Sequence, residues 1–260
     1  KGDVALRNEI NRSIDALFRS GEMQSIYERW GLWNETQTRL RETRVSPQTP
    51  NGSRIESGKT GLLSYLPLLL QGAAMTALIS VTAMALAVVL GLVIVLARLT
   101  GGRFLKSLAI VYIEIVRGTP LLLQLYIVYY GLPNIGVNLN AFTAAVLALG
   151  INYAAYESEI YRAGIDSIPK GQREAALSLV MTEFMIYRRI LVPQAAKIVL
   201  PPVTNDFIAL FKDSSLVSVI AIVELTKSYN MLAVSSMRFL ELGLLTAALY
   251  LTMSLPLSFL

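Results

Sequence analysis

The sequence predicts an all-α membrane protein with about five transmembrane helices, and two observations carry that prediction. Of its 260 residues, 54% are hydrophobic and 16% are charged, whereas a soluble domain carries about 25% charged residues. The mean hydropathy is accordingly high, at +0.53. Residues 61–97 contain no charged side chain, although about 20 apolar residues suffice to cross a bilayer core. A soluble enzyme is therefore disfavoured.

Apolar stretches recur along the chain and define the expected spans. One further apolar piece, residues 216–225, is too short to cross a bilayer and is expected to form a re-entrant or interfacial helix. The five expected spans are residues 61–97, 108–130, 140–164, 195–211 and 239–260.

Basic residues set the expected orientation, because Lys and Arg collect in cytoplasmic loops. The loop between the first two spans carries Arg98, Arg103 and Lys106, and the segment between the third and fourth spans carries six basic residues. The loop between the second and third spans carries none. The N-terminus is therefore expected outside and the C-terminus in the cytoplasm.

Several classes of site are excluded by composition. The chain contains neither cysteine nor histidine, so we expect no metal site, no disulfide and no Ser-His or Cys-His catalysis. The net charge of +5 is accounted for by Lys and Arg that collect on the cytoplasmic side of a membrane protein. Basic and aromatic residues do not alternate here in the way that stacking on nucleic acid bases requires. Residues 53–60 resemble a phosphate-binding loop, but Ser53 replaces its first glycine and no strand precedes it. We expect this chain to bind no ATP itself.

The N-terminal region has the composition of soluble protein. Residues 3–17 and 23–30 show the spacing of two short amphipathic helices, with Gly31 as a C-terminal cap. Two such helices cannot bury a core alone. Residues 34–61 are polar and rich in Pro, Gly and Ser, as in a linker. We expect the chain to begin and end within a longer protein, with a helical tail at 1–33, a linker at 34–61 and a membrane domain at 62–260.

Residues 166–193 separate the third and fourth spans and are charged. A helix is expected after Pro169, with the small residues Ala175 and Ala176 allowing close approach to a partner. Such a helix suits docking into a groove on a soluble protein. From the residues alone, an interfacial helix on anionic lipid is an equal alternative.

This segment resembles the EAA loop of binding-protein-dependent ABC permeases. Glu174, Ala175 and Ala176 match the loop's opening, and Ile190 and Pro193 match its end. Two positions depart from the pattern: Val180 stands in place of Gly, and Val192 in place of Leu. The first departure leaves open whether a tight turn forms at Val180 or the helix continues through it.

Other segments resemble polar amino-acid permeases in particular. They are residues 114–124, 155–164 and 212–217, and with the EAA loop they are spread in order over the region 62–260. Residues 1–32 resemble the last two helices of a periplasmic amino-acid-binding protein. The resemblance therefore implies a permease fused to the α-helical tail of a substrate-binding domain.

The resemblance implies the transmembrane subunit of an ATP-driven importer of basic or polar amino acids in the bacterial inner membrane. Two permease copies would pair, and a separate cytoplasmic ATPase dimer would bind ATP and Mg²⁺, so the chain itself would be no enzyme and hold no cofactor. An amino-acid-binding receptor, fused or separate, would deliver the substrate. The implied ATPase-coupling residues are Lys170, Gly171, Glu174, Ala175, Ala176, Val180 and Met181.

Candidate substrate-path residues follow from ionisable and polar groups in the spans, which are costly there and often functional. Arg162 is the natural partner of Glu159, which leaves Glu157 without a local counter-charge. We expect Glu157 to face the path and favour cationic amino acids; a place at the lipid interface or pairing with a neighbour is the alternative. Backbone amides freed before Pro120 would bind the substrate carboxylate. The remaining candidates are Glu159, Gly118, Thr119, Gln124, Ser214 and Ser215, whereas Asp213 is expected to form an exterior ion pair or gate element.

Two other classes of membrane protein remain alternatives. An ion-gradient-driven secondary transporter often shows inverted repeats, and the five stretches show no convincing repeat. A non-transporting receptor would signal through the spans to a cytoplasmic domain, and the sequence contains no such domain.

Overall fold

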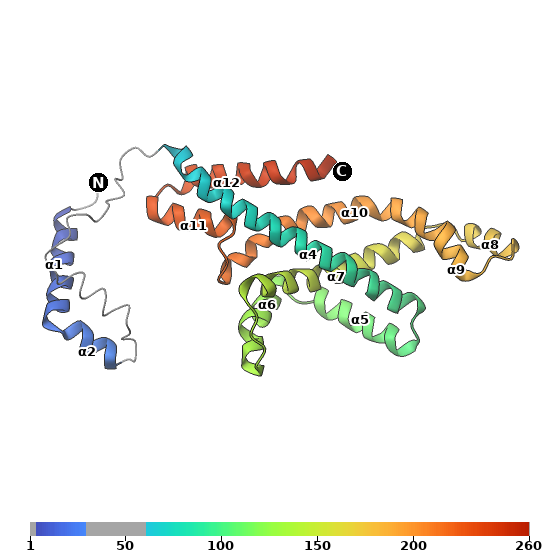
Figure 1. Ribbon diagram of the computed structural model, residues 1–260, viewed down its shortest axis with the longest axis horizontal. Coiled ribbons are helices and arrows are strands. Elements are labelled where there is room, and N and C mark those ends of the chain that lie inside the picture. The colour runs from blue at the N-terminus through green and yellow to red at the C-terminus, as the bar shows by residue number, and fades with distance from the viewer. Residues whose placement is uncertain (1–3, 30–60, 260) are drawn as a thin grey trace. The chain divides into compact units, whose positions relative to one another are not determined.

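The computed structural model describes residues 4–29 and 61–259, and these parts are helical without strands. Two compact units are present, Lys1–Lys59 and Thr60–Leu260, and each is considered by itself (Figure 1). The linker at 34–60 and the phosphate-loop-like residues 53–60 lie outside the described residues.

The first unit contains two helices where the sequence predicts them. Helix α1 is Val4–Ser20 and helix α2 is Glu22–Arg29. They are separated at Gly21, whose φ of +80° lies in the left-handed region that glycine adopts without strain. Ile10 and Ile26 remain about half exposed, so the apolar stripe of this unit has no covering partner within the described residues.

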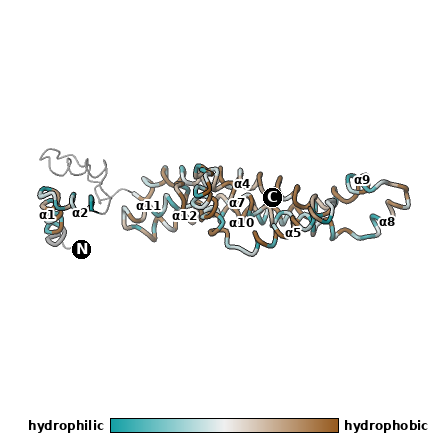
Figure 2. The backbone as a smooth tube through the Cα atoms, turned by 90° about the horizontal axis from the view of Figure 1, so that it is seen from below, coloured by the Kyte–Doolittle hydropathy of each residue, from teal (hydrophilic) through white to brown (hydrophobic). Residues whose placement is uncertain are grey.

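The second unit is organised around two long helices that pack along each other. Helix α4 is Leu66–Thr100, preceded by a 3₁₀ turn at Leu62–Tyr65, and helix α7 is Ala141–Asp166. Their close contact depends on glycine, because a Cβ at Gly91 would lie 2.8 Å from the Cβ of Glu157. Hydrophobic colouring runs along α4, and hydrophilic segments occur at α8 (Figure 2).

The second expected span, residues 108–130, is not a straight helix. Helix α5, Arg103–Arg117, ends before Pro120, and helix α6, Leu121–Tyr126, begins an arm, Leu121–Ile135, that is bent by 102° from α5. Proline removes a backbone donor and restricts the preceding residue, so the chain bends there. A π-turn at Ile127–Gly131 and a 3₁₀ turn at Leu132–Ile135 complete this arm.

The remaining helices lie within the charged segment and after it. They are α8 Lys170–Ser178, α9 Glu183–Ile186, a π-turn at Tyr187–Leu191, α10 Val192–Asp213, a 3₁₀ turn at Ser214–Val219, α11 Leu225–Ser236, α12 Phe239–Ser254 and a 3₁₀ turn at Pro256–Phe259. The expected short helix at 216–225 is thus a 3₁₀ turn followed by irregular chain.

By length and hydropathy alone, one helix in the described residues could cross a membrane, Leu62–Thr100. The bent pair Arg103–Arg117 and Leu121–Ile135 is a second if it forms one span. Helices α7 and α10 have 26 and 22 residues, but ionisable side chains lower their hydropathy. Helix α12 is apolar and has 16 residues.

Candidate functional site

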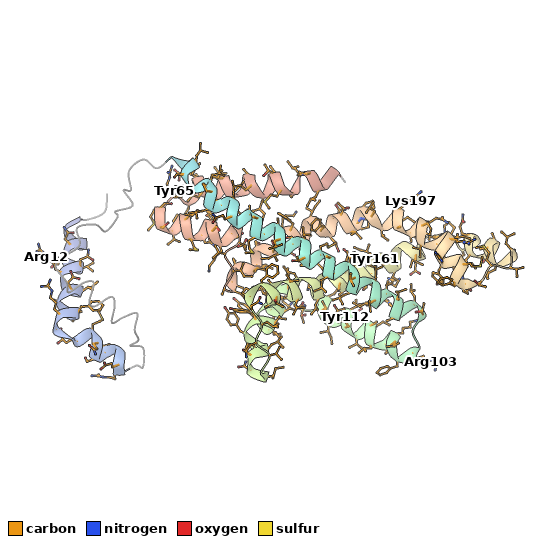
Figure 3. All side chains as sticks on the ribbon, viewed as in Figure 1. Arg12, Tyr65, Arg103, Tyr112, Tyr161 and Lys197 are labelled. Carbon is orange, nitrogen blue, oxygen red and sulfur yellow. The ribbon has the colours of Figure 1, made fainter. Side chains whose placement is uncertain are left out.

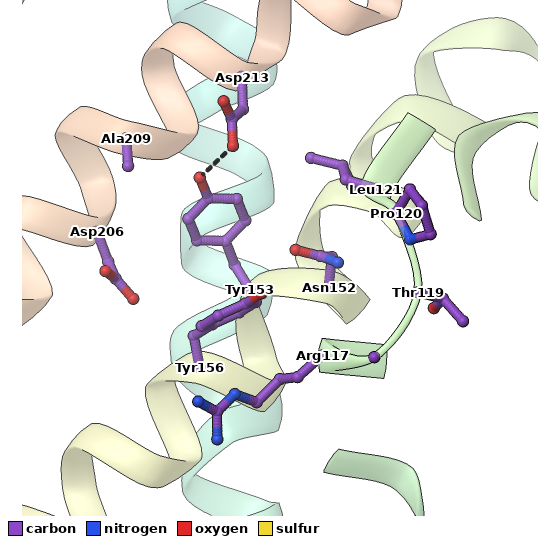
Figure 4. A pocket seen from close by; sticks show the side chains of 11 residues that line it. Arg117, Thr119, Pro120, Leu121, Asn152, Tyr153, Tyr156, Asp206, Ala209 and Asp213 are labelled. Carbon is purple, nitrogen blue, oxygen red and sulfur yellow. Dashed lines mark hydrogen bonds between the residues drawn. The ribbon is translucent and has the colours of Figure 1, made fainter. Parts of the chain in front are cut away.

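A cavity of about 530 Å³ lies where the bend between α5 and α6 faces α7 and α10. Figure 4 shows its side chains converging from these helices. Polar groups from segments far apart in sequence thus meet in one space. Its lining residues are Arg117, Gly118, Thr119, Pro120, Leu121, Asn152, Tyr153, Tyr156, Asp206, Ala209 and Asp213.

The cavity carries both signs of charge. The Arg117 guanidinium lies 5.4 Å from the centre of the Tyr156 ring, a cation–π geometry. On the α10 wall, Asp213 accepts a hydrogen bond of 2.8 Å from the Tyr153 hydroxyl. Asp206 Oδ2 is buried without a hydrogen-bond partner in the described part of the chain. This arrangement can hold a zwitterion, with its carboxylate toward Arg117 and its ammonium toward the aspartates.

Gln124 braces the bend instead of lining the cavity. Its Nε2 donates to Thr119 Oγ1 at 2.7 Å and to the Val116 carbonyl at 2.8 Å, while its Oε1 accepts from Asn152 at 3.0 Å. The side chain therefore links α5, α6 and α7. Gln124, predicted among the substrate-path residues, therefore supports the cavity wall.

Gly118 and Thr119 do line the cavity, but the expected free amide at Gly118 is absent. The Gly118 amide donates to the Glu114 carbonyl at 2.9 Å, because α5 is still hydrogen-bonded at that residue. The Thr119 hydroxyl donates to the Ile115 carbonyl at 2.9 Å. The Arg117 side chain therefore offers the cavity a cationic donor, whereas the Gly118 amide is already hydrogen-bonded.

Glu157 is fully buried and packs against Gly91 of α4, outside the cavity lining. Both of its carboxylate oxygens are buried without a hydrogen-bond partner in the described part of the chain. Ser214 is also buried, and its hydroxyl bonds to the Phe211 carbonyl at 2.7 Å. Neither Ser214 nor Ser215 is brought to the cavity.

Glu159 belongs to an ion-pair network at the ends of α4 and α7. One carboxylate oxygen accepts from Arg98 of α4, and the other from Arg162 at 2.8 Å. Arg162 also pairs with Asp166 at 2.7 Å. The predicted pairing with Arg162 is present, and the additional bond to Arg98 joins two helices just before the coupling segment.

The Glu159→Gln substitution should destabilise the permease by about 2 kcal/mol, because it leaves two partly buried guanidinium groups without their carboxylate. Thermal unfolding of the purified protein in detergent should show a midpoint lower by about 5 °C.

Glu241→Gln is the matched control for this network. Glu241 pairs with Arg238 three residues away at 3.4 Å, and both side chains are exposed. An exposed pair of this kind contributes about 0–1 kcal/mol. Equal shifts for the two variants would show that the Arg98–Glu159 bond adds nothing beyond a solvated pair.

Asp206, Asn152, Tyr153 and Asp213 are cavity residues that sequence reasoning did not select for the path. Asp206 lies within the fourth apolar stretch, so the rule that intramembrane ionisable groups are functional would have found it. Asp213, expected to form an exterior ion pair or a gate element, accepts a hydrogen bond from Tyr153 at the cavity. No sequence signal indicates that bond, which joins residues 60 positions apart.

The predicted coupling segment forms a short helical hairpin. Helix α8 begins after Pro169, as expected, and α9 follows after Thr182, which caps it by accepting from the Met185 amide at 3.4 Å. Arg173 and Glu183 pair across the two helices. Beneath them a small apolar core holds the hairpin in place, formed by Ile168, Ala176, Ile186, Leu191 and Ala195.

The turn at Val180 is present although glycine is not. Val180 has a φ of +58°; its amide donates to the Leu177 carbonyl at 2.9 Å, and the Met181 amide donates to the Ala176 carbonyl at 3.2 Å. These two bonds form a Schellman motif, which normally places glycine at this position. A β-branched residue in this conformation costs about 1–2 kcal/mol. Helix α8 therefore ends in the tight turn of the EAA pattern, and the backbone at Val180 is strained.

The predicted coupling residues divide into exposed and buried ones. Ala176 is 2% exposed and Met181 is half-buried against the same core. The other five form the outward surface of the hairpin: Lys170, Gly171, Glu174, Ala175 and Val180.

Comparisons with known proteins agree with these features. Residues 87–260 match the family described as the binding-protein-dependent transport system inner membrane component. The chain is 40% identical over 196 residues to the glutamine transport system permease protein GlnP of Escherichia coli (strain K12), covering 75% of this chain and 90% of that protein. It is 38% identical over 198 residues to the arginine transport system permease protein ArtQ of Bacillus subtilis (strain 168), covering 76% and 90%.

Solved structures show the same fold. An amino acid ABC transporter crystallised with histidines is 42% identical, with a TM-score of 0.72 over 77% of this chain and 95% of that one. The MetNI methionine ABC transporter in an inward-facing conformation has a TM-score of 0.56 at 16% identity, over 75% of this chain and 91% of that one. At this identity the similarity shows the fold alone. The chain therefore belongs to the binding-protein-dependent transport system inner membrane components, a family of multi-pass ABC importer permeases.

Proposed function

We propose that this permease forms the pathway of an ATP-driven importer of amino acids, with a preference for basic or polar ones. The observation that carries the proposal is the cavity in which Arg117 faces Asp206 and Asp213. A free amino acid carries one carboxylate and one ammonium, and a basic one carries a second cation. Two relatives, GlnP and ArtQ, are named as glutamine and arginine permeases, which supports this class of substrate.

ATP hydrolysis is assigned to a separate cytoplasmic subunit that binds ATP and Mg²⁺. Relatives of this chain are permease subunits and not enzymes themselves. The hairpin of α8 and α9 supports a docked ATPase dimer, because it has a small apolar core of its own while its outer side chains are exposed. Movement of the hairpin would then pass along α7, which α8 follows after a short turn.

Two copies of the permease are proposed to enclose the pathway as a homodimer. The cavity of one chain lies open beside the arm that contains α6, where Leu123, Ile127 and Tyr130 are about half exposed. A second copy would cover such a surface.

We propose that the N-terminus lies outside and the C-terminus in the cytoplasm. Arg103 and Lys197 lie toward the end of the second unit that carries α8 and α9 (Figure 3), which supports a cytoplasmic location for that end. The helices α1 and α2 are then on the exterior face. We propose that they are the tail of an amino-acid-binding receptor fused to the permease, since their apolar stripe needs a covering domain.

Uptake into proteoliposomes tests the proposal. The permease, its ATPase subunit and its receptor should together accumulate labelled arginine, lysine or glutamine only when ATP is supplied on the ATPase side. Collapse of proton and sodium gradients with ionophores should leave the rate unchanged. Uptake that needs a gradient and continues without the ATPase would instead identify a secondary transporter.

A further inference from the structure

We propose that the start of helix α5 binds an acidic phospholipid, with Arg103 and Lys106 on its phosphate and Phe104 among its acyl chains. Figure 3 shows Arg103 at the turn that joins α4 to α5. Residues 102–108, which cover the cap and the first turns of α5, are all exposed. This segment therefore has no covering partner within the described residues.

The two basic residues at the start of α5 are unfavourable within the chain itself. Arg103 and Lys106 lie three positions apart, so their side chains are neighbours on the helix surface and repel each other. Positive charge in the first turn is also disfavoured by the helix dipole. Residues 57–113 contain no acidic side chain, and neither basic residue forms an ion pair within residues 4–29 and 61–259. An anion from outside the described chain would therefore stabilise this segment.

The start of α12 has nearly the same residues with the charges balanced. Residues 103–106 read Arg-Phe-Leu-Lys, and residues 238–241 read Arg-Phe-Leu-Glu. Arg238 pairs with Glu241 three residues later at 3.4 Å, so this helix start is neutralised within the chain. The α5 start has lysine at the fourth position in place of glutamate. It lacks the internal pair and presents two positive charges to its surroundings.

The apolar side chains of α5 identify the anion as a lipid headgroup. Phe104 is 79% exposed and begins a stripe on one side of α5, because the residues that continue it are spaced by four and three positions. A free phosphate would leave this stripe uncovered, whereas a phospholipid covers both the stripe and the basic pair. Apolar residues beside Lys and Arg are typical of helices that contact anionic lipid. The stripe continues through Leu108, Val111 and Ile115, each more than half exposed.

The experiment measures which lipid contacts each helix start, through quenching of tryptophan fluorescence by brominated lipids. Trp30→Phe and Trp33→Phe remove the chain's two tryptophans, and Phe104→Trp or Phe239→Trp then places one reporter at the start of α5 or of α12. The purified permease is reconstituted in equimolar phosphatidylglycerol and phosphatidylcholine, with bromine on one lipid or the other. At position 104 phosphatidylglycerol should associate about 10-fold more strongly than phosphatidylcholine, as expected for two basic residues. At position 239 the ratio should be about 1.

Exchanging the charges tests the basic pair directly. Lys106→Glu gives the α5 start the charge pattern of α12 and should lower the ratio at position 104 about 10-fold. Glu241→Lys gives the α12 start two basic residues and should raise the ratio at position 239 about 10-fold. In detergent free of acidic lipid, Lys106→Glu should unfold at a thermal midpoint about 1 °C higher than the wild type, since a repulsion becomes an ion pair. That measurement separates a lost lipid contact from a lost fold.

The same measurements can overturn the proposal in distinct ways. Equal quenching by the two brominated lipids at position 104, or an unchanged ratio in Lys106→Glu, would show that the basic pair selects no lipid. Absence of quenching by either lipid would show that a second copy of the chain or another subunit covers the start of α5. Displacement of phosphatidylglycerol by millimolar inorganic phosphate would identify a site for the free anion instead of a lipid.

Discussion

Replacing Ala175 with arginine should abolish substrate-stimulated ATP hydrolysis in the assembled transporter. Ala175 lies on the exposed surface of α8, so a long guanidinium there would hold the helix away from the ATPase groove without disturbing the hairpin core. Arginine is also a good helix former. We expect stimulation by loaded receptor to fall at least about 10-fold, which corresponds to a loss of about 1.4 kcal/mol in docking. The measurement is ATP turnover in proteoliposomes with and without substrate.

Ala175→Ser is the control, because it keeps a small side chain at the same position and should retain most of the stimulation. Substrate binding to the receptor should be normal in both variants. Ala176 is unsuitable for this comparison, since it is buried in the hairpin core and arginine there would disrupt folding. Full stimulation in Ala175→Arg would show that α8 does not enter a groove on the ATPase.

The sequence predicts helices better than it predicts how they end or bend. Hydropathy locates α4, since an uninterrupted apolar run has few other solutions in a bilayer. Pro120 marks a break, but the angle depends on the bonds that Gln124 makes with Thr119 and with Asn152. The turn at Val180 likewise depends on Met181 reaching the hairpin core, which local propensity does not contain.

Tertiary bonds between distant residues explain most of what the sequence left open in the site. Glu224 is an example: it is fully buried, accepts from the amides of Thr226 and Lys227 at 2.7 Å, and also from Tyr250 of α12 at 3.2 Å. It thereby caps α11 and fastens it to α12. The sequence alone does not distinguish Glu224 from a candidate acid of the substrate path, because its partner Tyr250 lies 26 residues away.

Asp206→Asn should lower the uptake of lysine and arginine about 10-fold or more relative to glutamine. The substitution preserves shape while removing a negative charge from the cavity wall, and a hydrogen bond to a charged group contributes about 1.5–3 kcal/mol. Glutamine carries no side-chain charge and should lose less. The measurement is the ratio of initial uptake rates for lysine and glutamine in proteoliposomes that contain the complete transporter.

Glu157→Gln tests whether Glu157 or Asp206 gives the transporter its preference for cationic amino acids. The sequence favours Glu157 as the selective acid, whereas the structure places Glu157 behind the cavity against Gly91 and places Asp206 in its wall. If the cavity selects the substrate, Glu157→Gln should change the lysine-to-glutamine ratio less than Asp206→Asn does. A larger change for Glu157→Gln would move the selective site to the interface of α4 and α7. Equal loss of both amino acids in Asp206→Asn would show that Asp206 binds the ammonium group common to all amino acids.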